Sequence, residues 1–374
     1  MPMPSDRSPR PRKDRRAALR AVDRLGPLTR PRVAPLRLEA AVHPVTVLAA
    51  VAAGAGLLTW IAAGRSKRLG PAPHGGRQAP PDRGRAYGRR GAEVTASAAQ
   101  RLNHASSLLA GSVLFDSSLE HYRGQFFNRA MYTPIIVSSI TLASSLHGAG
   151  DTDPGRSGMR HAVQAVAGAT GLVGFGFHAW NVGKREGGYS FQNLFYAAPI
   201  GAPMALTLAG LLGVAAERVR DADPDAPRLA ALPAGKVLAL ATAAMLLGTT
   251  AEAGLLHFRG AFQNPAMLIP VTLPPLGAAA LALAATREPG TSQADAKAAM
   301  WAVSAMGVAG VAFHAYGVAR MMGGWSNWRQ NLIDGPPLPA PPSFSGVALG
   351  GLAALELVER HRSLSSPRRL HAPP

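Results

Sequence analysis

Long stretches of this chain carry almost no charged side chains for about 20 residues at a time, the length that a helix needs to cross the hydrocarbon core of a bilayer. These stretches predict nine membrane-spanning helices, at residues 43–63, 100–120, 130–149, 160–181, 194–217, 236–257, 266–286, 296–318 and 341–358. The fold class that follows is all-α: a polytopic integral membrane helical bundle.

Two sequence segments occur twice, 136 residues apart. HYRGQFFNRAMYTP at 121–134 returns as HFRGAFQNPAMLIP at 257–270, and FHAWNVGKREGGYS at 177–190 returns as FHAYGVARMMGGWS at 313–326. A fixed offset of this kind indicates a duplicated unit. We therefore predict two membrane halves, with bounds at residues 99–218 and 236–358, and a single anchor helix before them at residues 42–64.

A shorter period within each half predicts four helical hairpins of one design. In each hairpin a histidine ends the first helix, an asparagine follows, and a proline stands six positions after the asparagine. The histidines are His121, His178, His257 and His314, the asparagines are Asn128, Asn193, Asn264 and Asn331, and the prolines are Pro134, Pro199, Pro270 and Pro337. Because each period holds an even number of spans, all four histidine loops are expected on one side of the membrane. This parallel arrangement argues against an aquaporin-like interpretation of Asn264-Pro265-Ala266, which requires inverted halves.

Charge is concentrated outside these spans. Of the 39 Lys and Arg residues, eleven precede residue 41 and eight more lie between Arg65 and Arg90. We expect a disordered basic tail at residues 1–41, a basic linker rich in Pro and Gly at 65–98, and a second disordered tail at 359–374. The arginines of the first tail alternate with Pro and Gly without interleaved aromatic residues, so we expect the lipid bilayer as its partner and no nucleic acid.

The distribution of Lys and Arg also predicts an orientation. The histidine loops carry fewer basic residues than the opposite loops and the C-terminal tail, which places the histidine loops on the exoplasmic side of a cell membrane, expected to be a bacterial inner membrane. The basic N-terminal tail runs against this assignment, because a spanning first helix would carry that tail outside.

Helix capping and helix kinking account for most of the repeated residues. The Arg and Gly of His-x-Arg-Gly suit the last turn and the left-handed end of a helix, and the asparagines suit helix N-caps. Each proline is expected inside its helix, where it frees the carbonyl four residues before it.

Capping accounts less well for the histidines, because Lys or Arg would serve as well, yet all four hairpins use His. Imidazole is a common metal ligand and proton carrier, and polar groups at membrane depth are functional candidates. A carboxylate precedes the first histidine of each half by five residues: Asp116 and Glu252. The chain has no cysteine, which excludes thiolate ligation. Five residues turn a helix by about 140°, so acid and histidine do not share a face.

Three functional hypotheses follow, and the sequence assigns no enzymatic activity. The leading one is a membrane redox or electron-transfer component that binds haem b or a metal through His121, His178, His257 and His314, with a redox partner protein. The second is a transporter or channel-like protein, whose polar path or second shell is formed by Asp116, Glu252, Arg123 and Arg259. The third is a membrane assembly subunit without chemistry of its own.

Overall fold

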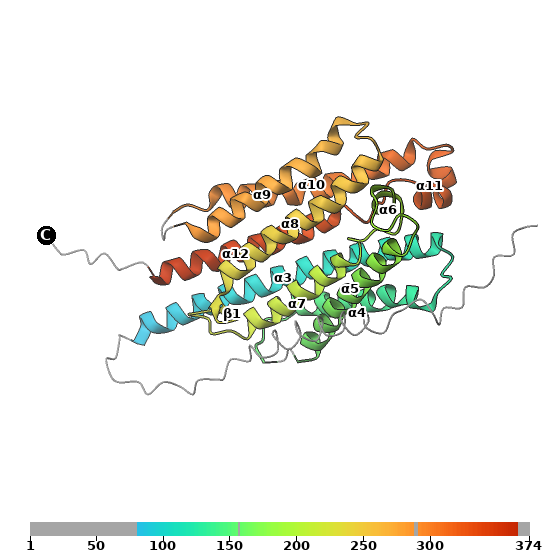
Figure 1. Ribbon diagram of the computed structural model, residues 1–374. Coiled ribbons are helices and arrows are strands. Elements are labelled where there is room, and N and C mark those ends of the chain that lie inside the picture. The colour runs from blue at the N-terminus through green and yellow to red at the C-terminus, as the bar shows by residue number, and fades with distance from the viewer. Residues whose placement is uncertain (1–80, 156–157, 288–290, 366–374) are drawn as a thin grey trace, which may run out of the picture. The chain divides into compact units, whose positions relative to one another are not determined.

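The computed structural model describes residues 81–155, 158–287 and 291–365, and this part of the chain is almost entirely helical (Figure 1). The expected basic tail and anchor helix lie outside it. The long helices are α3 (Pro81–Arg123), α4 (Thr133–Gly150), α5 (Gly158–Gly183), α7 (Met204–Arg220), α8 (Ala234–Arg259), α9 (Ile269–Thr286), α10 (Ala294–Ala319) and α12 (Pro342–Ser365). The short elements are η2 (Arg129–Tyr132), α6 (Phe191–Tyr196), β1 (Arg228–Leu229), β2 (Leu232–Pro233), η3 (Pro265–Leu268), η4 (Gly324–Asn327) and α11 (Trp328–Asp334).

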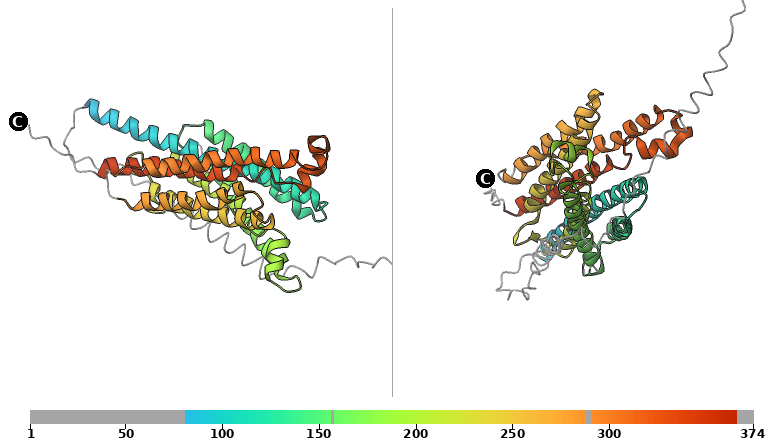
Figure 2. Two further views of the ribbon diagram at one scale, coloured as in Figure 1. Left: turned by 90° about the horizontal axis from the view of Figure 1, so that it is seen from above. Right: turned by 45° about the vertical axis from the view of Figure 1, so that its right-hand side comes forward.

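The long helices form two rings of four. In the first half, α3, α4, α5 and α7 each pack against the next helix around the ring, and in the second half α8, α9, α10 and α12 do the same. The halves join where α12 packs along α3, with a further contact between α7 and α8 (Figure 2). β1 and β2 form a two-residue antiparallel hairpin between the halves.

Four of these segments are long and apolar enough to cross a membrane: residues 158–183, 234–259, 265–286 and 294–319. They coincide with four of the expected spans. The structure therefore supports a membrane helical bundle, and the larger number of spans stays a prediction.

Helix bounds differ from the expected ones at three places. The expected span at 194–217 is divided into α6 and α7, because Pro199, Gly201 and Pro203 interrupt it. α3 begins at Pro81, so part of the expected linker is helical, and α12 continues to Ser365, into the expected C-terminal tail. Both extensions are rich in Arg, Ala, Leu or Glu, which favour helix.

Dense packing is confined to one end of the bundle. The main core is formed by residues 98–110 of α3, the helix α7, the first part of α8, the last part of α9, the first part of α10 and α12. Toward the end where α3, α5, α8 and α10 finish, fewer residues are buried, among them Val182 and Val318. No residue is buried in the described stretches 114–137, 172–181, 247–273 and 308–317. All four repeated histidines lie at this sparsely packed end.

Candidate functional site

The four histidines share one hydrogen-bonding pattern. In each, Nδ1 lies beside a backbone carbonyl oxygen of the connection that follows its helix. The pairs are His121 with Met131 at 2.5 Å, His178 with Pro199 at 2.5 Å, His257 with Met267 at 2.9 Å and His314 with Pro337 at 2.7 Å. A carbonyl only accepts, so Nδ1 is the donor, and in the neutral imidazole Nε2 is the nitrogen with the free lone pair. Within the described part of the chain, no hydrogen bond engages any of these Nε2 atoms.

The histidines are paired within each half. His121 on α3 and His178 on α5 interact electrostatically, as do His257 on α8 and His314 on α10. In each ring of four helices, the two helices that carry histidine are diagonally opposite, because each packs against the two others. Each half therefore carries two half-buried imidazoles on opposite helices of its ring.

The connections that follow α3 and α8 are built alike. Asn128 caps η2 by accepting from the Ala130 N–H, and Asn264 caps η3 by accepting from the Ala266 N–H, both at 2.9 Å. The glycine after each helix is not left-handed, contrary to expectation. The left-handed residues are the next two, Gln125 with Phe126 and Ala261 with Phe262. Gly260 packs closely instead, since a methyl group there would lie 2.9 Å from Met267 Cε, the end of a flexible side chain that would have to move.

Asn193 and Asn331 hold loops and do not cap helices. Asn193 Nδ2 donates to the carbonyls of Glu186 and Gly188, at 2.9 and 2.8 Å. Asn331 Nδ2 donates to Met322 and Gly324, at 3.2 and 2.8 Å. Ser190 is the N-cap of α6.

The four prolines lie at helix starts or before them. Pro134 and Pro270 occupy the first turn of α4 and α9, where proline is well tolerated. Pro199 and Pro337 lie in the connections that precede α7 and α12. The structure thus places them outside the helix interiors where we expected kinks. His178 and His314 donate to the carbonyls of Pro199 and Pro337 themselves. His121 and His257 donate to carbonyls three residues before Pro134 and Pro270.

Asp116 and Glu252 come together across the two halves. The two carboxylates are near enough to interact electrostatically, and Glu252 also interacts with Arg259. Glu252 Oε1 is buried without a hydrogen-bond partner among the described residues. Arg123 is half-exposed and pairs with Glu120 at 3.0 Å, whereas Arg259 donates to the Ala197 carbonyl at 3.4 Å and covers the Tyr196 ring at 5.8 Å.

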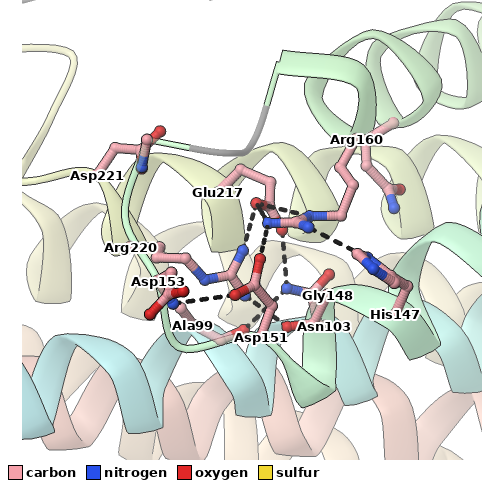
Figure 3. Close-up of polar contacts among 12 residues, drawn as sticks. Ala99, Asn103, His147, Gly148, Asp151, Asp153, Arg160, Glu217, Arg220 and Asp221 are labelled. Atoms are coloured by element: carbon pink, nitrogen blue, oxygen red, sulfur yellow. Dashed lines mark hydrogen bonds and ion pairs between the residues drawn. The ribbon is translucent and has the colours of Figure 1, made fainter.

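A buried polar network that the sequence analysis missed lies in the first half (Figure 3). Its centre is Glu217 of α7, which is fully buried and accepts from Arg160 of α5 at 2.9 Å, from Arg220, and from Asn103 of α3 at 3.0 Å. Arg160 also pairs with Asp151 at 2.8 Å. Two carboxylates and two guanidinium groups thus neutralise one another.

Further contacts tie the network to α4. Arg160 Nη1 lies 3.2 Å from His147 Nδ1, and Arg220 donates to the Gly148 carbonyl at 2.6 Å. The Asp153 backbone N–H donates to the Asp151 carboxylate and, together with Arg160, lowers the pKa of that carboxyl group below its usual value. All four helices of the first ring are therefore joined at this end, which is opposite to the histidines.

The second half has apolar residues at the aligned positions. Offsets of 136 residues before the loop insertion and 138 after it align Asn103 with Ala239, Arg160 with Ala296, Gln164 with Met300, Glu217 with Leu355 and Arg220 with Val358. All five counterparts are buried. This difference between polar residues in one half and apolar residues in the other is the sequence signal for the network. It was missed because only the positions that the two halves share were compared.

Among the described residues, no group of three or more His, Asp or Glu side chains is arranged to hold a metal ion. Compared with protein-family models, with curated proteins and with solved structures, the chain matches none of them.

Proposed function

We propose that this protein is a membrane electron-transfer component that binds one haem b in each half, between His121 and His178 and between His257 and His314. The observation that carries the proposal is the pairing of imidazoles across each ring, with every Nδ1 bonded to a carbonyl and no Nε2 hydrogen-bonded to a described residue. A histidine that ligates a metal commonly donates its other ring N–H to a backbone carbonyl, which fixes the ring and raises its basicity.

The surroundings of the pairs fit a planar prosthetic group. Bis-histidine ligation needs two imidazoles from facing helices, and each ring supplies that number. The four histidines lie in described stretches without buried residues, which fits an interior that a bulky apolar group fills, and the buried Val182 and Val318 lie one turn beyond His178 and His314. The chain has no cysteine, so the group would be held by ligation and packing and not by thioether bonds.

A structural role accounts for only one of the two ring nitrogens of each histidine. Donation from Nδ1 satisfies one carbonyl, and Asn, Gln or Ser side chains also donate hydrogen bonds to carbonyls. That role does not explain why the second nitrogen is kept unengaged in all four hairpins. When bound, haem supplies one-electron transfer; the residues of this chain orient the imidazoles and separate the two pairs, one in each half.

We further propose that the halves descend from one duplicated unit and that the bundle has nine spans. Support comes from α4 and α5, whose bounds at 133–150 and 158–183 reappear at 269–286 and 294–319 in α9 and α10. The hydrogen bonds of Asn193 and Asn331 to their loops are also equivalent. On the distribution of basic residues, we place the protein in a bacterial inner membrane with the histidine loops on the exoplasmic side, where a redox partner protein would bind.

The visible absorption spectrum of protein purified in detergent tests the haem proposal. We expect a Soret band, a sharp α-band on reduction, and two haems per chain by pyridine haemochrome assay. Substitution of His178 or of His314 by Ala is expected to reduce the content to one haem, whereas the exposed His104→Ala is the matched control and keeps two. A folded, colourless preparation from cells supplied with haem contradicts the proposal.

A transport path between the halves is the second candidate. It is favoured by the meeting of Asp116 and Glu252, one from each half, with one buried carboxylate oxygen unpartnered. Ion or proton flux into liposomes that contain the protein, lost in Asp116→Asn and Glu252→Gln, would support this candidate.

A further inference from the structure

The segment between α6 and α7 carries the carbonyl that orients His178, and the other half of the protein holds it. His178 Nδ1 lies 2.5 Å from the Pro199 carbonyl oxygen. On one side of Pro199, Arg259 of α8 donates to the Ala197 carbonyl at 3.4 Å and lies over the Tyr196 ring. The first half thus places its histidine against a segment whose position depends on a helix of the second half.

Glu252, two turns earlier on α8, holds the other side of this segment. Its carboxylate lies against the backbone of Gly201, close enough to interact with the Gly201 N–H. The contact is close, because a methyl group at Gly201 would lie 2.1 Å from Glu252 Oε2. Glu252 and Arg259 also attract each other electrostatically, so the two side chains act on the segment together.

The reverse contact is absent from the described part of the second half. There the carbonyl of Pro337 orients His314, and the residue aligned with Gly201 is Pro339, which has no backbone N–H to donate. The residue aligned with Arg259 is Arg123, which pairs with Glu120 on its own helix. Ser112 of α3 donates to the Pro339 carbonyl instead. The two histidine pairs are therefore held differently.

We infer that Glu252 and Arg259 are positioning residues for His178, so that the second half sets the imidazole geometry of the first. They act through the Pro199 carbonyl and touch no ligand themselves. A shift of this carbonyl reorients the His178 ring and changes the strength of the Nδ1–H bond, which tunes the ligand nitrogen. The consequence for haem rests on the proposed function: the His121–His178 site depends on Glu252, and the His257–His314 site does not depend on the aligned Asp116.

The first test reads the imidazole without reference to haem. Detergent-solubilised protein with ¹⁵N-labelled histidine is compared with Glu252→Ala, Glu252→Gln and Gly201→Ala, and the His178 signals are assigned as those missing from His178→Asn. We expect Glu252→Ala and Gly201→Ala to shift the His178 Nδ1–H resonance upfield, as its hydrogen bond lengthens. Glu252→Gln retains an acceptor for the Gly201 N–H and is expected to restore the wild-type position.

The second test uses the haem-loaded protein and electron paramagnetic resonance. Glu252→Ala is expected to shift the g-values of one low-spin haem, the one lost in His178→Ala, while the other stays unchanged. Ser112→Ala, which removes the contact to the Pro339 carbonyl of the second half, is the control and leaves the His178-dependent signal where it is. Unshifted His178 signals in Glu252→Ala, or equal effects of Glu252→Ala and Glu252→Gln, overturn the inference. A wild-type protein that binds no haem overturns the proposed function alone, because the imidazole resonances still report on Glu252.

Discussion

The buried carboxylate of Glu217 offers the sharpest test of the network in the first half. The side chain is 0 % exposed and accepts from Arg160, Arg220 and Asn103. In Glu217→Ala, Arg160 keeps Asp151, but Arg220 keeps only the Gly148 carbonyl. Breaking a buried ion pair from one side costs about 3–5 kcal/mol, and we expect a loss of that size in the free energy of unfolding.

The second half supplies the matched control, because it packs apolar residues at the same positions. The fourfold variant Asn103→Ala, Arg160→Ala, Glu217→Leu and Arg220→Val copies that half. Replacing a buried ionic cluster by packed apolar residues is commonly neutral or stabilises by roughly 1–4 kcal/mol. The Asp151 carboxylate, which this variant leaves without Arg160, is partly exposed and keeps the Asp153 N–H. We therefore expect the fourfold variant to be at least as stable as the wild type, although it contains the change at Glu217.

Unfolding by sodium dodecyl sulfate in mixed micelles, followed by circular dichroism, measures both variants on one scale. A loss below about 1 kcal/mol in Glu217→Ala would refute the reasoning, since that is the range of an exposed ion pair. The reasoning also fails if the fourfold variant loses as much as Glu217→Ala. The cost would then come from the shape of the side chains and not from uncompensated charge.

The pH dependence of stability, the packing of two glycines and the loop asparagines allow direct checks on other parts of the structure. Because the folded pKa of Asp151 is lowered, its contribution to stability is complete above about pH 4 and is lost as the pH falls through that lowered value; the loss of melting temperature in acid should be smaller in Asp151→Asn. Gly210→Ala would place a methyl group 2.4 Å from the backbone of α5 and should destabilise, whereas Gly248→Ala meets nothing within 4 Å and should raise the melting temperature slightly. Asn331→Ala removes two bonds to loop carbonyls and should speed proteolysis of residues 320–327, with Asn193→Ala acting likewise in the first half; unchanged cleavage would contradict this role.

For the four histidines, the sequence predicted their equivalent positions but not their contacts. The repeat in the sequence shows that the four histidines occupy equivalent positions. It also shows that histidine is used where helix capping would accept Lys or Arg. Their hydrogen bonds could not be predicted, because the accepting carbonyl lies ten residues from His121 and 23 residues from His314 along the chain. Only the folded connection decides which carbonyl reaches Nδ1.

The asparagines differ in the same way, because two of them make local hydrogen bonds and two make bonds to more distant residues. Asn128 and Asn264 bond to a backbone N–H two residues on, so the local sequence was enough to predict their caps. Asn193 and Asn331 bond backward to loops five to nine residues away, where the path of the chain matters. The prolines likewise start helices or precede them, because the helices that follow the histidine loops begin later in the chain than predicted.

The sequence by itself determined that this protein is a helical membrane bundle and where its apolar helices lie, because hydrocarbon requires runs of uncharged residues whatever the tertiary contacts. Tertiary structure alone decided which residues meet. In the sequence, Glu217 is a single acid near the end of a helix. In the structure, α3, α5 and α7 enclose it together with two arginines. Glu252 precedes His257 by five residues in the sequence, yet its carboxylate lies against the segment whose carbonyl accepts from His178 of the other half. Burial and pairing depend on the packing of distant helices, and that packing is what local sequence does not contain.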